Sequence, residues 1–351
     1  MTFVSKIVRS NFFIRLRSWE YWPFIIIQFP IVFYWIWLAI RARAPFFFSA
    51  SNPTIPTGGM MGESKFDILT KIPQHYVPPS ILIRSPVTKE EVLEKIRRKN
   101  MDFPLVFKPD LGERGWMVRR ILNEEDLILY LQDIRTDFIV QELVDLPLEL
   151  AIFYVRFPNE DAGFVTSVTR KGMLAIEGNG HATVRDLILA NDRAKLQWET
   201  LAKNFNPQLN HVLPKGKRLE LVSIGNHCLG TTFLDANNLI NEELHQVFDS
   251  ISKQIDGFYF GRYDLRTASV EDLYAGKIQI MELNGCGAEP AHIYQPGASI
   301  FAAWRALILH WKTMFEISRQ NHIRGVPYLR IKEGLVFFRN FKRVKALHAT
   351  P

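Results

Sequence analysis

The chain has 351 residues, 47% of them hydrophobic and 23% charged, and a formal net charge of +7 from 43 basic and 36 acidic residues. This composition is that of a folded protein with a sizeable core, and it excludes a disordered chain. The positive charge gathers near both ends, and no zinc-ligand spacing or nucleic-acid motif is present, so nucleic acid is not an expected partner. The two cysteines, Cys228 and Cys286, form no paired pattern, which favours a reducing cytosolic compartment.

An apolar run occupies 24–40, where Gln28 is the one clearly polar residue. Aromatic residues lie near both of its ends with arginines beyond, as at membrane–water interfaces. No small-residue cleavage site follows, which disfavours a removable signal peptide. Residues 1–45 are therefore expected to form a basic, membrane-associated segment. It is either a short transmembrane helix or, because of Pro23 and Pro30, a re-entrant element. A buried helix of a soluble protein is the alternative.

The rest of the chain mixes strands and helices. A Pro- and Gly-rich loop is followed by an extended stretch over 68–83 and by a helix over 87–99 with Thr88 as its N-cap. Residue alternation and turn residues predict strands at 105–108, 117–122, 138–143, 150–156, 163–169, 219–223, 258–266 and 277–284. Helices are predicted over 124–134, 242–255 and 300–318, and after the turn at 178–183, where Thr183 and Asp186 are spaced as a capping box. Without strict strand–helix alternation, these elements indicate an α+β domain.

Two of the late strands carry polar residues at alternate positions. Arg262 and Asp264 share one face of the first strand, and Glu282 and Asn284 share one face of the second. If the strands are neighbours, two carboxylates and an amide oxygen converge beside a fixed positive charge. Such hard oxygen ligands suit Mg²⁺ held together with nucleotide phosphates. Two ordinary half-buried strands with polar ends are the alternative.

Two further segments point to a nucleotide. Lys108 ends a strand, and Gly112 and Gly115 follow it in a turn where backbone amides and the lysine could contact phosphate oxygens. The P-loop spacing is absent, and a hairpin with a surface lysine is the alternative. The stretch 141–144 ends another strand, with Glu149 after a proline turn. The backbone of this stretch could bind an adenine edge, and the Glu149 carboxylate could bind the ribose. Taken alone, the stretch is an ordinary strand edge.

The order of these segments resembles the ATP-grasp superfamily. The likeness is nearest to D-alanine–D-alanine ligases and to the ATP-grasp parts of cyanophycin and glutathione synthetases, and it covers roughly 64–318. FPLVFKPDLGERGWMV is similar to their phosphate-lysine strand and flap, FGRYDLR and IQIMELNGCGAEP to their magnesium strands, and GNGHATVRDLI to a G-x-G-x-x-T turn of the synthetases. The resemblance implies two α+β subdomains that grip ATP, a small one over 101–148 and a large one over 149–320. Residues 46–100 would be a connector and the start of this region, and 321–351 a basic tail.

The resemblance also assigns roles to residues. Metal ligands would be Asp264, Glu282 and Asn284, for two Mg²⁺ ions that Mn²⁺ could replace. Nucleotide-binding residues would be Lys65, Lys108, Gly112, Gly115, Glu142, Leu143, Glu149 and Lys171. The catalytic residues would be Arg262, which would steady an acyl phosphate and the tetrahedral intermediate, and Lys108, on the nucleotide phosphates. Arg170 and Lys171 lie where relatives place a basic group.

These roles imply a ligase that forms C–N bonds and produces ADP, joining a carboxylate to an amine or thiol. No nucleophilic side chain is required. His227 and His292 could contact substrate, but isolated histidines are more often structural, and Cys286 is expected to serve packing. The relatives carry a domain of about a hundred residues before the flap; here the space holds the apolar segment. We therefore expect an enzyme on the cytoplasmic side of the membrane with a lipid-linked or envelope-related substrate. A phosphotransferase and a catalytically silent nucleotide-binding scaffold are the alternatives. The sequence leaves the oligomeric state open.

Overall fold

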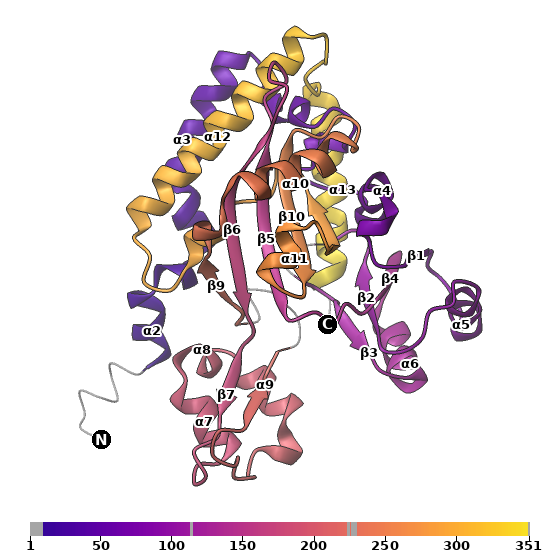
Figure 1. Ribbon diagram of the computed structural model, residues 1–351, viewed down its shortest axis with the longest axis vertical. Helices are drawn as coiled ribbons and strands as arrows, with labels where there is room; N and C mark the ends of the chain where they lie inside the picture. The colour runs from indigo at the N-terminus through magenta and orange to yellow at the C-terminus, as the bar shows by residue number, and fades with distance from the viewer. Residues whose placement is uncertain (1–9, 113–114, 223–224, 226–229, 350–351) are drawn as a thin grey trace.

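The computed structural model describes residues 10–112, 115–222, 225 and 230–349, and two antiparallel sheets form its centre (Figure 1). The smaller sheet has the order β1-β4-β2-β3. Its strands are β1 (Ser80–Ile83), β2 (Leu105–Pro109), β3 (Arg119–Ile121) and β4 (Phe138–Glu142). Helices α5 (Lys89–Arg98) and α6 (Glu124–Asp133) cover one face and enclose a core that includes Phe107, Tyr130 and Phe138. The predicted N-cap of α5 is confirmed, because the Thr88 and Glu91 side chains each accept the other's backbone N–H.

The larger sheet has the order β11-β10-β5-β6-β9. Its strands are β5 (Leu148–Val155), β6 (Phe164–Gly172), β9 (Thr232–Asp235), β10 (Phe260–Thr267) and β11 (Ile278–Asn284). Helices α10 (Glu242–Lys253) and α11 (Val270–Tyr274) pack on one face, where Phe248 and Tyr263 are fully buried. The long helix α12 (Ile300–Ile323) and the 3-10 helix η2 (Phe47–Ser51) pack on the other face. The sheet is therefore the middle of three layers, and its strands extend toward the smaller sheet.

A third, smaller unit is inserted between β6 and β9, at the lower end of Figure 1. It contains β7 (Ala175–Glu177), β8 (Arg218–Glu220), α7 (Val184–Ala190), α8 (Asp192–Lys195) and α9 (Trp198–Asn204), with a core of its own. The turn at 178–183 leads into α7, and the predicted capping box is present: Thr183 and Asp186 satisfy each other's backbone N–H. His227 and Cys228 lie outside the described residues.

The N-terminal apolar segment forms α3 (Phe24–Ala42), preceded by the short helix α2 (Asn11–Arg17). Within the described ranges, α3 is the one helix long and apolar enough to cross a membrane, a test that core helices of soluble proteins and signal sequences also pass. One side of α3 packs on α12: Ile27 and Ile31 are 2% exposed, and Trp304 Nε1 donates to the Ile27 carbonyl at 2.9 Å. Figure 1 shows α3 and α12 side by side.

The loop after α3 is fixed to the larger sheet by hydrogen bonds. The buried Asn52 side chain donates to the carbonyls of Gly58 and Phe260 and accepts the Phe260 N–H, so that it bonds the loop to β10. The Gly58 carbonyl accepts the N–H of Cys286 at 3.0 Å, and the Gly59 carbonyl accepts that of Gly287 at 2.9 Å. A Cβ on Gly59 would lie 2.6 Å from Gly285 Cα, so the two backbone segments approach more closely than side chains would allow.

Several sequence-based expectations were wrong. The stretch 68–83 is extended only in part, because α4 (Lys65–Lys71) begins at the N-cap Ser64, whose hydroxyl accepts from Asp67 N–H, and Pro73 follows its end. Helix α12 continues five residues beyond 318, and within the expected basic tail residues 331–349 form α13 (Ile331–Ala349). Helices α2, α8, α9 and α11 and strands β7 and β9 were not predicted; all are seven residues or shorter, where periodicity is weak.

Candidate active site

The predicted polar residues of β10 and β11 lie on one face of the larger sheet. The two strands are neighbours and pair antiparallel, with Asp264 opposite Glu282 and Arg262 opposite Asn284. Asn284 Nδ2 donates to Asp264 Oδ2 at 2.9 Å, and Arg262 Nη2 donates to the same oxygen at 3.1 Å. Lys171 Nζ lies 2.8 Å from the other oxygen, Oδ1. Asp264 is thus a buried carboxylate at the centre of three polar partners.

The charges around Asp264 keep it ionised. Burial favours the neutral carboxyl, but Arg262 and Lys171 outweigh burial and lower the pKa of Asp264 to about 2. For Glu282, burial likewise raises the pKa, and the nearby charges of Lys65 and Lys108 reverse the effect and lower it. Both carboxylates are therefore negatively charged at neutral pH.

Lys108 crosses from the smaller sheet to the larger one. From β2 its Nζ donates to Gln141 Oε1 and to the Met281 carbonyl, both at 2.9 Å. The register of β10 and β11 shifts between Asp264 and Leu265, so Met281 has no partner residue on β10 and its carbonyl is open to the lysine. Burial disfavours the ammonium form and lowers the pKa of Lys108 to about 8. Lys108 is thus a buried cation between the two sheets, and the alternative of a surface lysine is wrong.

Lys65 is a further lysine near the acidic strands. At the start of α4, its Nζ donates to the Gly112 carbonyl and lies 3.4 Å from Glu282 Oε1. It thereby connects the turn after β2 with the acidic strand β11. Gly115 has a φ of +69°, the left-handed conformation that glycine adopts without strain. Residues 113 and 114 of this turn lie outside the described part of the chain.

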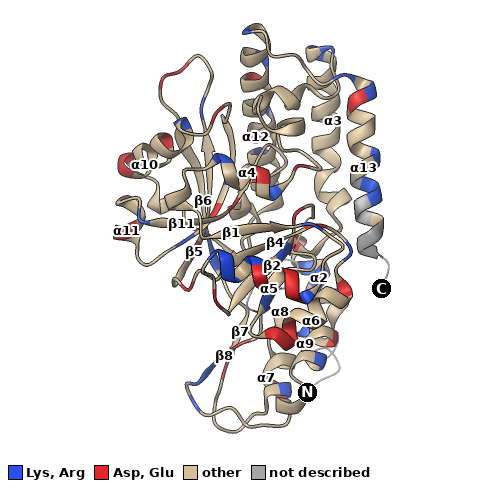
Figure 2. Ribbon diagram, turned by 90° about the vertical axis from the view of Figure 1, so that its right-hand side faces the viewer, with Lys and Arg blue, Asp and Glu red and all other residues tan. Residues whose placement is uncertain are grey.

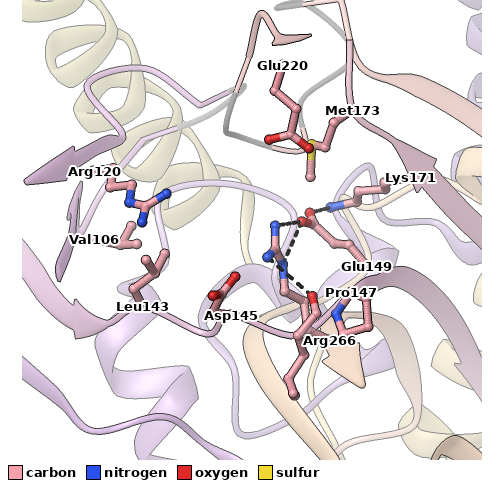
Figure 3. A pocket seen from close by; sticks show the side chains of 11 residues that line it. Val106, Arg120, Leu143, Asp145, Pro147, Glu149, Lys171, Met173, Glu220 and Arg266 are labelled. Carbon is pink, nitrogen blue, oxygen red and sulfur yellow. Dashed lines mark hydrogen bonds and ion pairs between the residues drawn. The ribbon is translucent and has the colours of Figure 1, made fainter. Parts of the chain in front are cut away.

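A cavity of about 210 Å³ lies between the two sheets, and Lys171 is the one lysine among its lining residues (Figure 3). Its lining residues are Val106, Arg120, Leu143, Asp145, Leu146, Pro147, Glu149, Lys171, Met173, Glu220 and Arg266. The predicted hinge residue Leu143 and the predicted ribose ligand Glu149 are among them. Glu142 is exposed and does not line the cavity, and its backbone N–H donates to the Pro79 carbonyl at 2.9 Å. Arg170 is exposed, whereas its neighbour Lys171 points toward the carboxylates, as strand alternation requires.

Arg266 was missed by the sequence reasoning, although it is two residues from Asp264 and so on the same face of β10. Its Nε and Nη2 donate to Glu149 Oε2 at 3.0 and 2.7 Å, and its Nη1 donates to the carbonyls of Val144 and Leu146 at 3.1 and 3.4 Å. Figure 3 shows Arg266 and Lys171 converging on Glu149. Arg266 therefore fixes both the carboxylate and the hinge loop, and the alternation Arg-x-Asp-x-Arg was the signal that could have revealed it.

The remaining residues considered for substrate contact have structural surroundings. His292 Nδ1 lies 2.6 Å from Ser167 Oγ, and burial lowers the pKa of its imidazole. Cys286 is 2% exposed, its backbone bonds to Gly58, and burial raises the pKa of its thiol, which agrees with the packing role expected for it. Among the residues that the structure describes, no group of three or more His, Cys, Asp and Glu side chains is arranged to hold a metal ion.

The site thus joins two antiparallel sheets, a smaller one with the lysine-bearing turn and a larger one with the paired acidic strands. The chain is similar to solved structures of VanG D-Ala:D-Ser ligase from Enterococcus faecalis (13% identity, 74% of this chain, 62% of that one, TM-score 0.42) and D-alanine–D-alanine ligase from Bacillus anthracis (16%, 77%, 71%, 0.43). A third is a bifunctional glutathione synthetase from Pasteurella multocida (15%, 70%, 35%, 0.35). No protein-family model and no curated protein sequence matches.

D-alanine–D-alanine ligase and glutathione synthetase are also the proteins that the sequence resemblance named. The chain spans less than two thirds of the D-Ala:D-Ser ligase and about a third of the glutathione synthetase. With TM-scores below 0.5 and identities of at most 16%, the likenesses carry no argument about the reaction. The function has to be argued from the site itself.

The buried position of Lys108 makes stability depend on pH. Its pKa is about 8 in the folded protein and 10.5 in the unfolded chain, so between these values the unfolded chain binds more protons and stability rises with pH. Between pH 7.5 and 9.5, without nucleotide or metal, wild type should gain about 1–2 kcal/mol relative to Lys108→Met. Urea unfolding at each pH measures this gain, and Lys277→Met, at an exposed lysine, is the control. Parallel pH curves for wild type and Lys108→Met would contradict a charged, buried Lys108.

Replacing Arg266 should destabilise the protein and the hinge loop that lines the cavity. Arg266→Ala leaves Glu149 with Lys171 alone and frees two hinge carbonyls, so we expect a loss of about 2–4 kcal/mol in unfolding free energy. ATP affinity should fall as well, because the hinge and Glu149 are no longer fixed. Arg120→Ala is the control, since it removes the same charge from the same cavity. Urea titration and calorimetric ATP binding measure both effects, and equal losses in the two variants would show that only overall charge matters.

Proposed function

We propose that this chain is a membrane-associated, Mg-ATP-dependent ligase that joins a carboxylate to an amine or thiol through an acyl phosphate. The site would lie on the cytoplasmic side, and its substrate would be presented at the membrane, as a lipid-linked or envelope precursor is. The observation that carries this proposal is the excess positive charge around the buried carboxylates. Five cations, Lys65, Lys108, Lys171, Arg262 and Arg266, lie with the carboxylates Glu149, Asp264 and Glu282, and the Glu289 carboxylate also acts on Arg262, so that the net charge is +1.

A net positive, largely buried cluster favours a polyanion. The three lysines approach from α4, β2 and β6, so a triphosphate along the cluster would contact ammonium groups from both sheets. The cavity beside them suits part of a nucleotide, with Leu143 on the adenine side and Glu149 toward the ribose. The backbone N–H and carbonyl groups of the hinge would supply hydrogen bonds to the base edge. ATP is therefore the ligand that the charge and the cavity support best.

The residues of β10 and β11 fit Mg²⁺ only together with phosphates. Asp264 and Glu282 are ionised hard oxygen donors on adjacent strands, and Asn284 adds an amide oxygen, but three ligands leave an octahedral ion incomplete. Phosphate oxygens would complete the coordination. When bound, Mg²⁺ would neutralise charge on the transferred phosphoryl group. Because Lys171 and Arg262 already contact Asp264, they would have to share or release this carboxylate when the ion binds.

The chemistry requires charge stabilisation and no nucleophilic side chain. A carboxylate is a poor electrophile, and attack of its oxygen on the γ-phosphorus of ATP forms an acyl phosphate and releases ADP. An amine then attacks the acyl carbon, and phosphate leaves. Lys65 and Lys108 would hold the phosphates in line. Arg262, whose guanidinium is fixed by Asp264 and by the Glu289 carbonyl at 3.0 Å, would stabilise the oxyanion of the second step.

An isotope experiment tests the proposal. Candidate carboxylates labelled with ¹⁸O are incubated with Mg-ATP, with and without a candidate amine, and ADP, phosphate and amide are measured. The acyl-phosphate route transfers one ¹⁸O into the released phosphate, whereas a phosphotransferase retains a phosphorylated product and releases no phosphate.

Profiling of metabolites and lipids in cells without the protein and in cells with Asp264→Asn would identify the carboxylate. If Glu282→Gln bound Mg-ATP and turned over as wild type does, the enzyme proposal would fail and a silent nucleotide-binding scaffold would remain.

A further inference from the structure

Helix α3 has one face packed on the protein and an opposite face that is apolar and exposed. Ile27, Ile31 and Leu38 are at most 2% exposed, whereas Phe29 and Phe33 are 61% and 59% exposed. The exposed face continues over the whole helix from Ile25 to Ile40. A soluble surface rarely carries so long an apolar stripe without a partner. We therefore expect a partner to cover this stripe. The contacts that fix α3 to the rest of the protein indicate which kind of partner it is.

Both ends of α3 are fixed to the same folded body. Before the helix, Trp19 Nε1 donates to the Ala298 carbonyl, and Glu20 forms an ion pair of 2.8 Å with Arg193, in which both side chains are nearly buried. After the helix, Phe47 and Phe48 are buried against Met314 and Phe315 of α12. Trp19 and its neighbours therefore pack within the protein and do not form the interfacial belt that the sequence suggested.

This attachment is incompatible with a membrane-spanning α3. A helix of 19 residues is about 28 Å long, nearly the thickness of the hydrocarbon core, so a spanning helix would place its ends on opposite sides. The contacts at both ends would then pull α12 into lipid along with α3. Helix α12 carries Arg305, Lys312, Glu316 and Arg319, whose charges are costly in hydrocarbon. At a membrane, the helix can keep these contacts only if it lies along the surface.

The charges beside the apolar face favour an anionic bilayer. Four of the five charged residues from 10 to 45 are arginines, and the fifth is the buried Glu20. Arg15 and Arg17 belong to α2, where Phe12 and Leu16 are exposed. At the other end, the Arg41 guanidinium lies 4.8 Å above the Trp37 ring, the pairing of arginine and tryptophan that suits a lipid headgroup layer.

Helix α13 extends this surface. Its Gly334 lies against the Phe46 ring, so closely that a Cβ there would be 2.3 Å from a ring carbon. Ile331, Leu335 and Val336 are exposed, and lysines and arginines outnumber the single Glu333 along the helix. Figure 2 shows α3 and α13 along the same side of the molecule, away from α10 and α11.

We propose that α2, α3 and α13 form a monotopic docking face, on which the protein lies against an anionic bilayer with α3 in the plane of the interface and without a transmembrane span. This inference deepens the membrane association of the proposed function and rests on it. The face is close to the reacting end of the site. Gln28 of α3 donates to a Glu289 side-chain oxygen, and the Glu289 carbonyl accepts from Arg262. The packed side of α3 is thus connected to Arg262 through Glu289.

Vesicle binding tests the docking face. The purified full-length chain is sedimented with phosphatidylcholine vesicles containing 25% phosphatidylglycerol, and with phosphatidylcholine alone. We expect binding to the anionic vesicles and at least tenfold weaker binding of the double variant Phe29→Glu/Phe33→Glu. Leu129→Glu is the matched control, because Leu129 is 56% exposed on α6 of the smaller sheet. Binding that is equal in both variants, or a soluble dimer of the wild type that ignores vesicles, would overturn the inference.

Cysteine labelling decides the topology. Asn11→Cys and Arg43→Cys place thiols before and after α3, and a membrane-impermeant maleimide is added to right-side-out vesicles from expressing cells, with the parent chain as background. In-plane docking on the inner surface predicts that both sites are labelled only after permeabilisation; labelling of one site alone in sealed vesicles would show a span. Turnover of soluble carboxylates by Phe29→Glu/Phe33→Glu separates the two proposals. If the double variant loses vesicle binding but retains turnover, the docking proposal is supported. If the chain binds vesicles but shows no turnover, the ligase proposal fails and the docking proposal stands.

Discussion

Replacing Asp264 with asparagine should abolish Mg-ATP turnover and also destabilise the protein without any ligand. The carboxylate is 4% exposed and faces Lys171 and Arg262, so the variant leaves two buried cations without their shared anion. Removal of one partner from such a cluster costs about 3–5 kcal/mol in unfolding free energy. Turnover should fall at least ~10²–10³-fold, the range for loss of one preorganised charged group. Urea unfolding of the ligand-free protein and ADP release measure the two effects.

Asp133→Asn is the matched control for this variant. Asp133 also pairs with an arginine, Arg119, at 2.6 Å, but the two side chains are 52% and 39% exposed. Solvent screens that pair, and its loss should change the unfolding free energy by about 0–1 kcal/mol without an effect on turnover. If Asp264→Asn were as stable as Asp133→Asn, the buried charge cluster would not exist as described. If it were unstable but retained full turnover, Asp264 would be structural and the metal role would fail.

The acidic strands could be predicted from the sequence because alternation is a local rule. Arg262, Asp264, Glu282 and Asn284 share one face for the same reason that any i and i+2 residues of a strand do, and only the pairing of β10 with β11 had to be assumed. The same rule also places Arg266 on this face of β10. It was missed because its partners, Glu149 and the carbonyls of Val144 and Leu146, come from residues more than a hundred positions earlier. Local patterns identify a face, but not what lies opposite it.

The apolar segment shows a second limit of sequence reasoning. From 24 to 40 almost every residue is hydrophobic, so no periodic pattern distinguishes the side of α3 that packs on α12 from the side that is exposed. A membrane span, a re-entrant element and a buried helix therefore remained open. The deciding contacts, Trp304 to the Ile27 carbonyl and Gln28 to Glu289, are formed by residues more than 250 positions away. The bulge at Met281, which offers Lys108 a carbonyl, also depends on tertiary pairing and has no sequence signal of its own.

Alanine at Gly59 should be far more damaging than alanine at Gly62, three residues further along the same loop. Both glycines have a left-handed φ, +81° and +74°, so both substitutions carry the backbone cost of roughly 1–2 kcal/mol. Around Gly62 a Cβ meets nothing within 4 Å, whereas at Gly59 it would lie 2.6 Å from Gly285 Cα. Two backbones would have to separate, at a further cost of roughly 1–3 kcal/mol.

The segment that would move begins one residue after Asn284, so Gly59→Ala should also weaken Mg-ATP binding, while Gly62→Ala should leave it unchanged. Urea unfolding and calorimetric titration of both variants measure these differences. Equal stability of the two variants would mean that the close approach of the loop to Gly285 is not part of the folded protein. A destabilised Gly59→Ala with normal nucleotide affinity would instead separate the loop from the metal-binding strand. The stretch before the first sheet would then serve stability alone, and its position beside Asn284 would have no bearing on the reaction.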